Sequence, residues 1–278
     1  MRLLIGCDFS SSPSRRKQIV LATGRMDRGR LVLQGLERLA SLDAFSAWLL
    51  QHPAWTGGFD LPFGLPRELV QALGWPLEWE SCIRHYASLS RAEIRTLFTA
   101  FCDARPVGGK FAHRATDGPA ASSPSMKWVN PPVAWMLHAG VPRLLDAGVH
   151  LPGVQPALPA GTQVTRVALE AYPALLAREM VGARSYKSDD AAKQTPERLI
   201  ARKDVIHGLE MGSTRLGLRL KLSHAQREAL EEDASGDALD AVLCLVQAAW
   251  AQAQCDAGHP CYGLPATLDP LEGWILTA

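Results

Sequence analysis

The distribution of apolar and polar positions along the chain predicts a protein that mixes strands and helices. Short apolar runs that end at turn-forming residues are typical of buried strands. Five such runs occur, at residues 2–8, 17–23, 30–35, 55–59 and 163–170. The second and third runs are separated by a turn around Asp27 to Gly29, and such a short connection favours an antiparallel hairpin. A short closing strand is also expected near the end of the chain, at residues 272–275.

Helices are predicted where apolar positions recur at helical spacing behind a capping residue. Ser41 is placed to cap a helix that reaches Gln51, and Ser223 to cap a later one. Thr195 with Pro196 starts a helix to about Met211. The most apolar helix is expected to begin at Asp237, after Ser235 and Gly236, and to run to about Gln254.

The order of these elements predicts an α/β fold in which a mixed five-stranded sheet is flanked by helices. Residues 61–161 show no alternating strand pattern, and their helical stretches are separated by loops rich in Gly, Pro and Ser. We therefore expect a core formed by residues 1–60 and 162–278, with a helical insertion or cap, residues 61–161, between the fourth and fifth strands. The ends of strands one and four and the start of the last helix are expected to lie together.

Composition narrows the class of protein only moderately. The 278 residues are 47% hydrophobic and 21% charged, which fits a globular protein of one elaborated or two small domains. The net charge of +1 does not discriminate for or against a nucleic-acid partner. No apolar run is long enough for a signal peptide or a membrane span, and the six cysteines lack a disulfide pattern. We expect a cytoplasmic protein without a membrane partner.

Acidic residues occupy comparable positions at the ends of the predicted elements. Asp8, Asp60 and Glu170 each follow a short apolar run, and Asp237 and Asp240 lie on one face at the start of the last helix. Buried carboxylates are costly unless a cation or a proton compensates them. Carboxylate oxygens are ligands that Mg²⁺ and Mn²⁺ prefer, and four of them can hold two ions about 4 Å apart. The pattern predicts a metal site.

Each acid also has a structural explanation. An acid in the first helical turn, such as Asp237, complements the helix dipole and caps backbone N–H groups. Asp60 precedes Leu-Pro and fits an ordinary Asx turn. Asp8 could turn outward at its strand end, and Glu170 could be exposed. Their shared type of position nevertheless favours a common site over five independent explanations.

Several blocks of the chain resemble one family. They are Gly-Cys-Asp-Phe-Ser-Ser-Ser-Pro at 6–13, Phe-Asp-Leu-Pro-Phe-Gly-Leu-Pro at 59–66, Glu-Ala-Tyr-Pro at 170–173, Gly-Asp-Ala-Leu-Asp-Ala at 236–241 and Glu-Gly-Trp-Ile at 272–275. In content and order these blocks resemble those of domain-of-unknown-function family four-two-nine, described as predicted nucleases with an RNase H-like fold.

The resemblance implies a carboxylate-held site for Mg²⁺ or Mn²⁺ on an RNase H-like sheet. It implies metal ligation by Asp8 on strand one, by Asp60 at the end of strand four, and by Asp237 with Asp240 on the last helix. Glu170 would be a further catalytic acid of less defined role. The chain departs from RNase H enzymes at Asp60, where they often have Glu.

Three further residues are candidates for substrate binding. Arg114 and Asp117 belong to the block His-Arg-Ala-Thr-Asp at 113–117, which also resembles the family, and Lys187 follows the fifth predicted strand. Arg114 and Lys187 fall in loops near the predicted strand ends, where a cation could neutralise substrate phosphate. The alternative is that these charges belong to an ordinary solvated surface.

The sequence thus favours a Mg²⁺- or Mn²⁺-dependent nuclease with a nucleic-acid substrate, and two other hypotheses stay open. An actin-like or sugar-kinase-like phosphotransferase would share the sheet and the acid of the first strand, but the Ser-rich turn after Asp8 lacks a Gly-rich phosphate loop. A non-catalytic nucleic-acid-binding protein of the same fold would bind equally well in a chelator.

Overall fold

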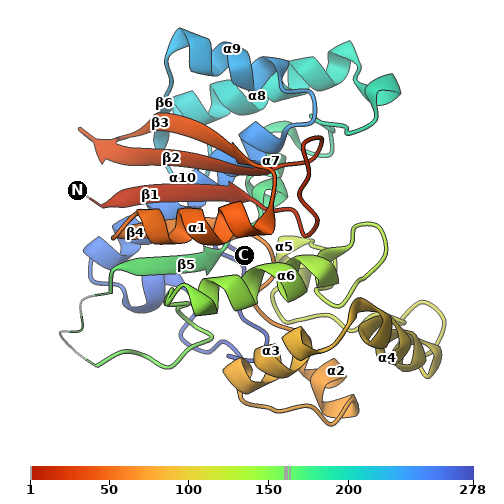
Figure 1. Ribbon diagram of the computed structural model, residues 1–278. Coiled ribbons are helices and arrows are strands. Elements are labelled where there is room, and N and C mark those ends of the chain that lie inside the picture. The colour runs from red at the N-terminus through yellow and green to blue at the C-terminus, as the bar shows by residue number, and fades with distance from the viewer. Residues whose placement is uncertain (1, 160–161, 163) are drawn as a thin grey trace.

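The computed structural model, which describes residues 2–159, 162 and 164–278, shows an α/β fold built on one mixed sheet (Figure 1). The strands lie in the order β5-β4-β1-β2-β3-β6. Their bounds are Leu3–Asp8 (β1), Ile19–Asp27 (β2), Arg30–Leu39 (β3), Trp55–Asp60 (β4), Arg166–Glu170 (β5) and Arg219–Lys221 (β6).

Strand directions confirm that antiparallel pairing comes first along the chain and parallel pairing later. β1 pairs antiparallel with β2, and β2 with β3, whereas β4 is parallel to both β1 and β5. The sheet has six strands rather than the expected five, because β6 pairs parallel with the start of β3. Only three residues long, with a single buried side chain, β6 has no sequence pattern that would reveal it.

Ten α-helices complete the described part of the chain. Their bounds are Leu42–Gln51 (α1), Arg67–Ala72 (α2), Trp79–Ser88 (α3), Arg91–Asp103 (α4), Asp117–Ala120 (α5), Val133–Asp146 (α6), Pro173–Val181 (α7), Pro196–Met211 (α8), His224–Glu232 (α9) and Asp237–Asp256 (α10). The predicted caps are confirmed at Ser41 and Ser223, whose side chains accept hydrogen bonds from Ala44 N and Gln226 N. The helices α3 and α7 were not expected.

Helices cover both faces of the sheet (Figure 1). The long helix α10 packs against β1, β4 and β2 on one face, and α1 and α6 lie together on the other. Two glycines allow α10 to approach the sheet closely. A Cβ added to Gly6 would lie 1.9 Å from the carbonyl oxygen of Ala241, and one added to Gly58 would lie 2.5 Å from that of Cys244. The start of α10 is thereby fixed over the ends of β1 and β4.

The segment between β4 and β5 carries α2 to α6, as the expectation of a helical insertion requires. It packs directly on the sheet, because one hydrophobic cluster joins Ile5 and Phe59 of the sheet to Tyr86, Phe98 and Leu137 of the insertion. Burial of apolar side chains is the main stabilising contribution to such a contact. The insertion therefore shares the hydrophobic core of the sheet.

The end of the chain differs from expectation. Residues 272–275 form no strand; instead Ile275 N donates to Thr116 Oγ1, and Leu276 N donates to the carbonyl oxygen of Glu170. The fifth strand starts at Arg166, and Gln163, the expected first residue, lies outside the described residues. Within residues 2–159, 162 and 164–278, none of the helices has the length and apolar character that a bilayer span requires.

Candidate metal centre

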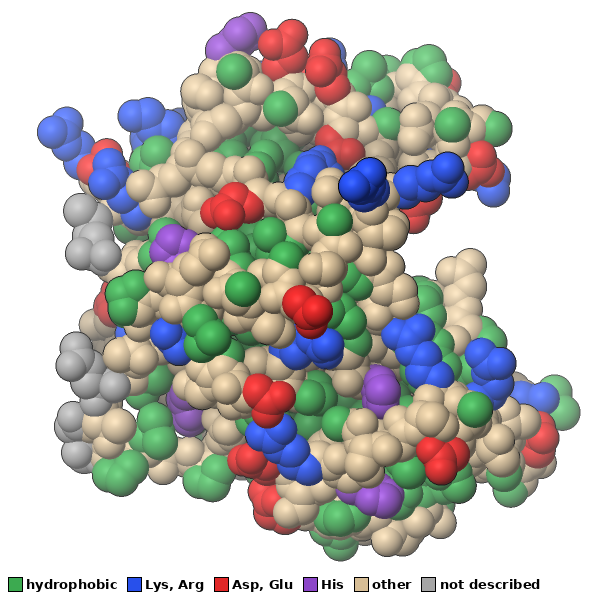
Figure 2. Space-filling model, viewed as in Figure 1, with side chains coloured by type: hydrophobic (Ala, Val, Ile, Leu, Met, Phe, Trp, Pro, Cys, Tyr) green, Lys and Arg blue, Asp and Glu red, His purple; other side chains and the backbone are tan. Residues whose placement is uncertain are grey.

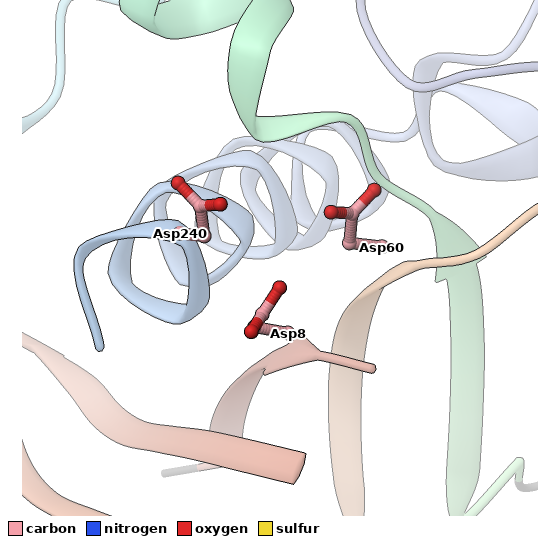
Figure 3. A group of neighbouring side chains, drawn as sticks. All are labelled: Asp8, Asp60 and Asp240. Atoms are coloured by element: carbon pink, nitrogen blue, oxygen red, sulfur yellow. The ribbon is translucent and has the colours of Figure 1, made fainter. Parts of the chain in front are cut away.

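Three of the predicted acids meet at one end of the sheet. Asp8 ends β1, Asp60 ends β4 and Asp240 lies in the first turn of α10. One carboxylate oxygen from each lies within 4.8 Å of the other two, and the three side chains face a common space (Figure 3). The cluster thus joins residues that are far apart in the chain, since Asp8 and Asp240 are separated by 232 positions. We call Asp8, Asp60 and Asp240 the three-aspartate centre.

The register of the sheet places these residues together. Asp8 is the direct neighbour of Asp60 across the parallel β1–β4 pair, as Gly6 is of Gly58. Side chains alternate between the faces of a strand, so the two acids lie on the same face as the two glycines. The glycines admit α10 to this face, and its first turn then brings Asp240 over the two strand ends.

The centre holds negative charge that the chain only partly compensates. Asp8 is only 9% exposed, and within the described residues no hydrogen bond reaches the carboxylate of Asp8 or Asp60. Burial, followed by the nearby Asp240, raises the pKa of Asp8 well above its ordinary value. The same two causes raise the pKa of Asp60 to about 7. A bound proton or an external cation would compensate this charge.

Asp240 differs from its two neighbours in having partners on both carboxylate oxygens. The Tyr186 hydroxyl donates to Oδ1 at 2.5 Å, and the Lys187 ammonium donates to Oδ2. Burial opposes the charge of Lys187, but Asp240, Tyr186 and Asp8 together outweigh it and raise the pKa of Lys187 well above its usual range. Lys187, a predicted substrate-binding residue, thus lies at the three-aspartate centre.

Asp237 lies beside the centre but outside the group of three. Its Oδ1 accepts from Lys17 Nζ at 2.7 Å, and the same ammonium contacts Asp189 at 3.0 Å. Asp237 still adds to the negative potential that raises the pKa of Asp8. Its role as a metal ligand stays a prediction, since its carboxylate is not one of the three whose oxygens lie within 4.8 Å of one another.

Glu170 lies on the other side of the sheet. In the parallel β4–β5 register it is the neighbour of Phe59 rather than of Asp60, so its side chain lies on the face opposite the two aspartates. There the Arg114 guanidinium donates to both carboxylate oxygens of Glu170, at 2.8 and 2.7 Å, and Phe63 N donates at 2.9 Å. Glu170 is therefore paired within the protein.

Arg114 is the centre of a buried ion-pair network rather than an open cation. Its side chain also donates to Asp117 Oδ1 at 3.1 and 3.0 Å and to the Glu272 carbonyl at 3.0 Å. Asp117 in turn accepts from Arg114 N and from the Ser122 hydroxyl. We call Arg114, Asp117 and Glu170 the arginine network; it joins the insertion to β5 and to the end of the chain.

A cavity of about 160 Å³ adjoins Asp60 between the end of the sheet and the insertion. Glu170, Tyr172 and the insertion residues Val133 and Met136 are among its lining residues. A larger hollow of about 830 Å³ lies around the other end of α10, lined in part by Cys255 and Tyr262, and the three aspartates do not line it. Of the two cavities, only the smaller one is lined by a member of the three-aspartate centre, Asp60, and Arg114 and Glu170 line it as well.

The surface around the strand ends is hollowed. The carboxyl ends of β1 and β4 point to the right in Figure 1, where Figure 2 shows a hollow between the β1–β2 loop and α4 with Lys and Arg side chains on both sides. Arg15 and Arg16 of this loop and Arg91 and Arg95 of α4 are exposed. Arg91 also donates to the carbonyl oxygen of Ser11, so the loop and the insertion touch.

The donor set suits a hard divalent cation. Three carboxylates supply only oxygen, which Mg²⁺ and Mn²⁺ prefer, and the spacing allows all three to contact one ion. A cation would also neutralise the charge that burial makes costly at Asp8 and Asp60. The residues present therefore fit Mg²⁺ or Mn²⁺.

Three residues of this region were not expected from the sequence: Lys17, Tyr186 and Gly236. Lys17 contacts Asp237, which is 220 positions away in the chain, and Tyr186 contacts Asp240, which is 54 positions away. No local sequence pattern indicates either contact. Gly236 precedes α10 and was expected only as a helix start. A Cβ added there would lie 2.6 Å from Cβ of Lys187.

Comparison of the chain with models of protein families, with curated proteins and with solved structures finds no match.

Proposed function

We propose that this chain is a nuclease that hydrolyses phosphodiester bonds with Mg²⁺ or Mn²⁺ held by Asp8, Asp60 and Asp240. The observation that carries the proposal is the convergence of these three carboxylates within 4.8 Å at the ends of β1, β4 and the start of α10. Among the described residues, only Asp240 of the three has a cation of the protein paired to it. Three ionised carboxylates so close together destabilise the folded protein unless they bind a cation.

The topology supports an RNase H-like interpretation of the fold. Strands β3-β2-β1-β4-β5 form an antiparallel set followed by two parallel pairs, which agrees with the mixed sheet that the resemblance to family four-two-nine implies. The acids stand at the ends of the first and fourth strands and on the last helix, as the same resemblance implies. Membership of that family is part of the proposal.

A divalent cation bound by the three aspartates would polarise a phosphoryl oxygen and lower the pKa of a water molecule. The protein contributes the remaining interactions. Lys187 holds a positive charge at Asp240, where it can attract a substrate phosphate. Arg15 and Arg16 of the β1–β2 loop and Arg91 of α4 are exposed on the elements beside the hollow and can bind the flanking phosphates of a nucleic-acid strand.

The arginine network has a supporting role in this proposal. Arg114 and Asp117 were predicted to bind substrate, but their charges are neutralised by each other and by Glu170. They fix the insertion against β5 beside the cavity that adjoins Asp60. We propose that they maintain the wall of the substrate site.

A cleavage screen tests the proposal. Single-stranded, double-stranded and branched DNA and RNA are incubated with the protein and Mn²⁺, and in parallel with a chelator. We expect cleavage of at least one substrate with Mn²⁺, none with chelator, and none by Asp8→Asn or Asp240→Asn, whereas Asp103→Asn, an exposed acid at the end of α4, keeps activity. Full activity of Asp8→Asn would defeat the assignment.

The other two hypotheses predict different results in the same samples. A non-catalytic binder would retain the nucleic acid equally well with and without chelator, with no turnover. A phosphotransferase would bind ATP in calorimetry. Neither hypothesis has a structural observation in its favour that the nuclease proposal lacks.

A further inference from the structure

The charges at the three-aspartate centre suggest how many cations it holds. In the fully ionised form that a metal ion would bind, the three carboxylates carry three negative charges, and the Lys187 ammonium paired with Asp240 removes one of them. The remaining two negative charges equal the charge of one divalent cation. The neighbouring Asp237 is paired with Lys17 at 2.7 Å and is not one of the three acids whose oxygens converge.

Lys187 is held at the centre by packing as well as by charge. Its aliphatic stem lies on Gly236, where an added Cβ would stand 2.6 Å from Cβ and 3.0 Å from Cδ of the lysine. Gly236 has a φ of +75°, a left-handed conformation that glycine adopts without strain. The backbone of Lys187 is also fixed, since Ser185 Oγ and Arg198 Nη1 both donate to its carbonyl oxygen. The ammonium is therefore a built part of the centre.

A second ion would need additional carboxylate ligands. Two divalent cations in one site require a larger set of oxygen ligands than three single atoms. Asp237 is the nearest further acid of the last helix, but it is bound to Lys17. Glu170 is bound to Arg114 on the other face of the sheet. Among the described residues, no fourth acid has a carboxylate oxygen within 4.8 Å of those of Asp8, Asp60 and Asp240.

We propose that the centre holds one divalent cation and that the ammonium of Lys187 supplies, beside it, the positive charge that a second ion would bring. This inference rests on the proposed function, because it takes the three aspartates as the metal site. The geometry gives Lys187 a defined place next to Asp240, where its charge can stabilise negative charge that develops on a substrate phosphate. Lys187 then acts at the centre itself rather than at a distant phosphate.

Titration of the wild-type protein with Mn²⁺ in a calorimeter tests the inference without any need for a substrate. We expect one ion per chain at saturation. Two ions per chain would overturn the inference and leave the proposed metal-dependent nuclease standing. No binding at the three-aspartate centre would overturn both.

The variant Lys187→Met tests the role of the lysine. Methionine keeps much of the aliphatic stem on Gly236 but removes the charge that repels an incoming cation. We expect Mn²⁺ to bind at least about tenfold more tightly while cleavage is lost, and circular dichroism checks that the variant is folded. The matched control is Lys193→Met, an exposed lysine of the same segment, which should leave both quantities unchanged. Unchanged or weaker Mn²⁺ binding by Lys187→Met would overturn the inference.

Discussion

The two buried acidic groups of this protein make an instructive comparison. In the arginine network, Glu170 and Asp117 share Arg114, whose donors reach both carboxylates and a backbone carbonyl. In the three-aspartate centre, on the other face of the sheet, Asp8 and Asp60 receive no hydrogen bond from any described residue. The carboxylates paired with Arg114 serve the fold, whereas the unpaired Asp8 and Asp60 indicate a place for a ligand.

Because the two acidic groups have different roles, we expect substitutions in them to have opposite effects on the free energy of unfolding. The largest change is expected in the arginine network. Arg114→Met leaves Glu170 and Asp117 buried without their cation. Because Arg114 is only 3% exposed, we expect the free energy of unfolding to fall by about 3–5 kcal/mol. Urea unfolding measures the loss, which Mn²⁺ should not restore. A loss below about 1 kcal/mol would show that the network is not a structural ion pair.

A glycine variant affects the three-aspartate centre through its scaffold. Gly6→Ala would push α10 away from β1, since its Cβ would meet the backbone of Ala241. We expect a loss of about 3 kcal/mol, at the upper end of the usual cost of overpacking, together with loss of Mn²⁺ binding. Gly35→Ala in β3 is the matched control, because its Cβ would make only an ordinary contact of 3.4 Å. Equal Mn²⁺ affinity of both variants would contradict this account of the centre.

Removal of an acid from the three-aspartate centre should stabilise the metal-free protein. Asp8→Asn takes away one of the mutually repelling buried charges, so we expect the free energy of unfolding in a chelator to rise by about 1 kcal/mol. The stabilisation by Mn²⁺ seen in the wild type should disappear in this variant. Urea unfolding with and without Mn²⁺ measures both effects. Destabilisation of the metal-free variant would place Asp8 with the structural acids instead.

The last prediction is a dependence on pH. The folded protein raises the pKa of Asp60 to about 7, so it holds a proton there that the unfolded chain releases near its lower ordinary pKa. The contribution of Asp60 to metal-free stability therefore falls as the pH rises from about 4 to about 7. Mn²⁺ competes with that proton, so the increase in Tm caused by Mn²⁺ should be larger at pH 8 than at pH 5.5. An increase independent of pH would contradict the assignment of Asp60.

The sequence identified the ends of β1 and β4 and the start of α10, because each combines a local pattern with an acid. It therefore located Asp8, Asp60 and Asp240, whose side chains the structure brings together. The alternation of side chains along the strand explains why Glu170, which was grouped with them, does not lie with them. Its position after an apolar run is similar, but the strand register sets it beside Phe59, one residue out of step with Asp60.

Other features depend on contacts between distant parts of the chain. Lys17 pairs with Asp237, and the side chain of Lys187 packs on Gly236, because the fold brings these distant segments together at the end of the sheet. No local residue spacing indicates these contacts. The short strand β6 is recognisable only through its partner β3. The residues that bear charge were thus predictable, whereas their partners, which decide whether a charge is structural or functional, were not.

The most direct test of the central claim is a crystal of the protein grown with Mn²⁺ and measured for anomalous scattering. The account predicts one peak between Asp8, Asp60 and Asp240, with carboxylate oxygens at about 2.1 Å and Lys187 still at Asp240. Absence of a peak there at saturating Mn²⁺, with the three carboxylates in place, would contradict it.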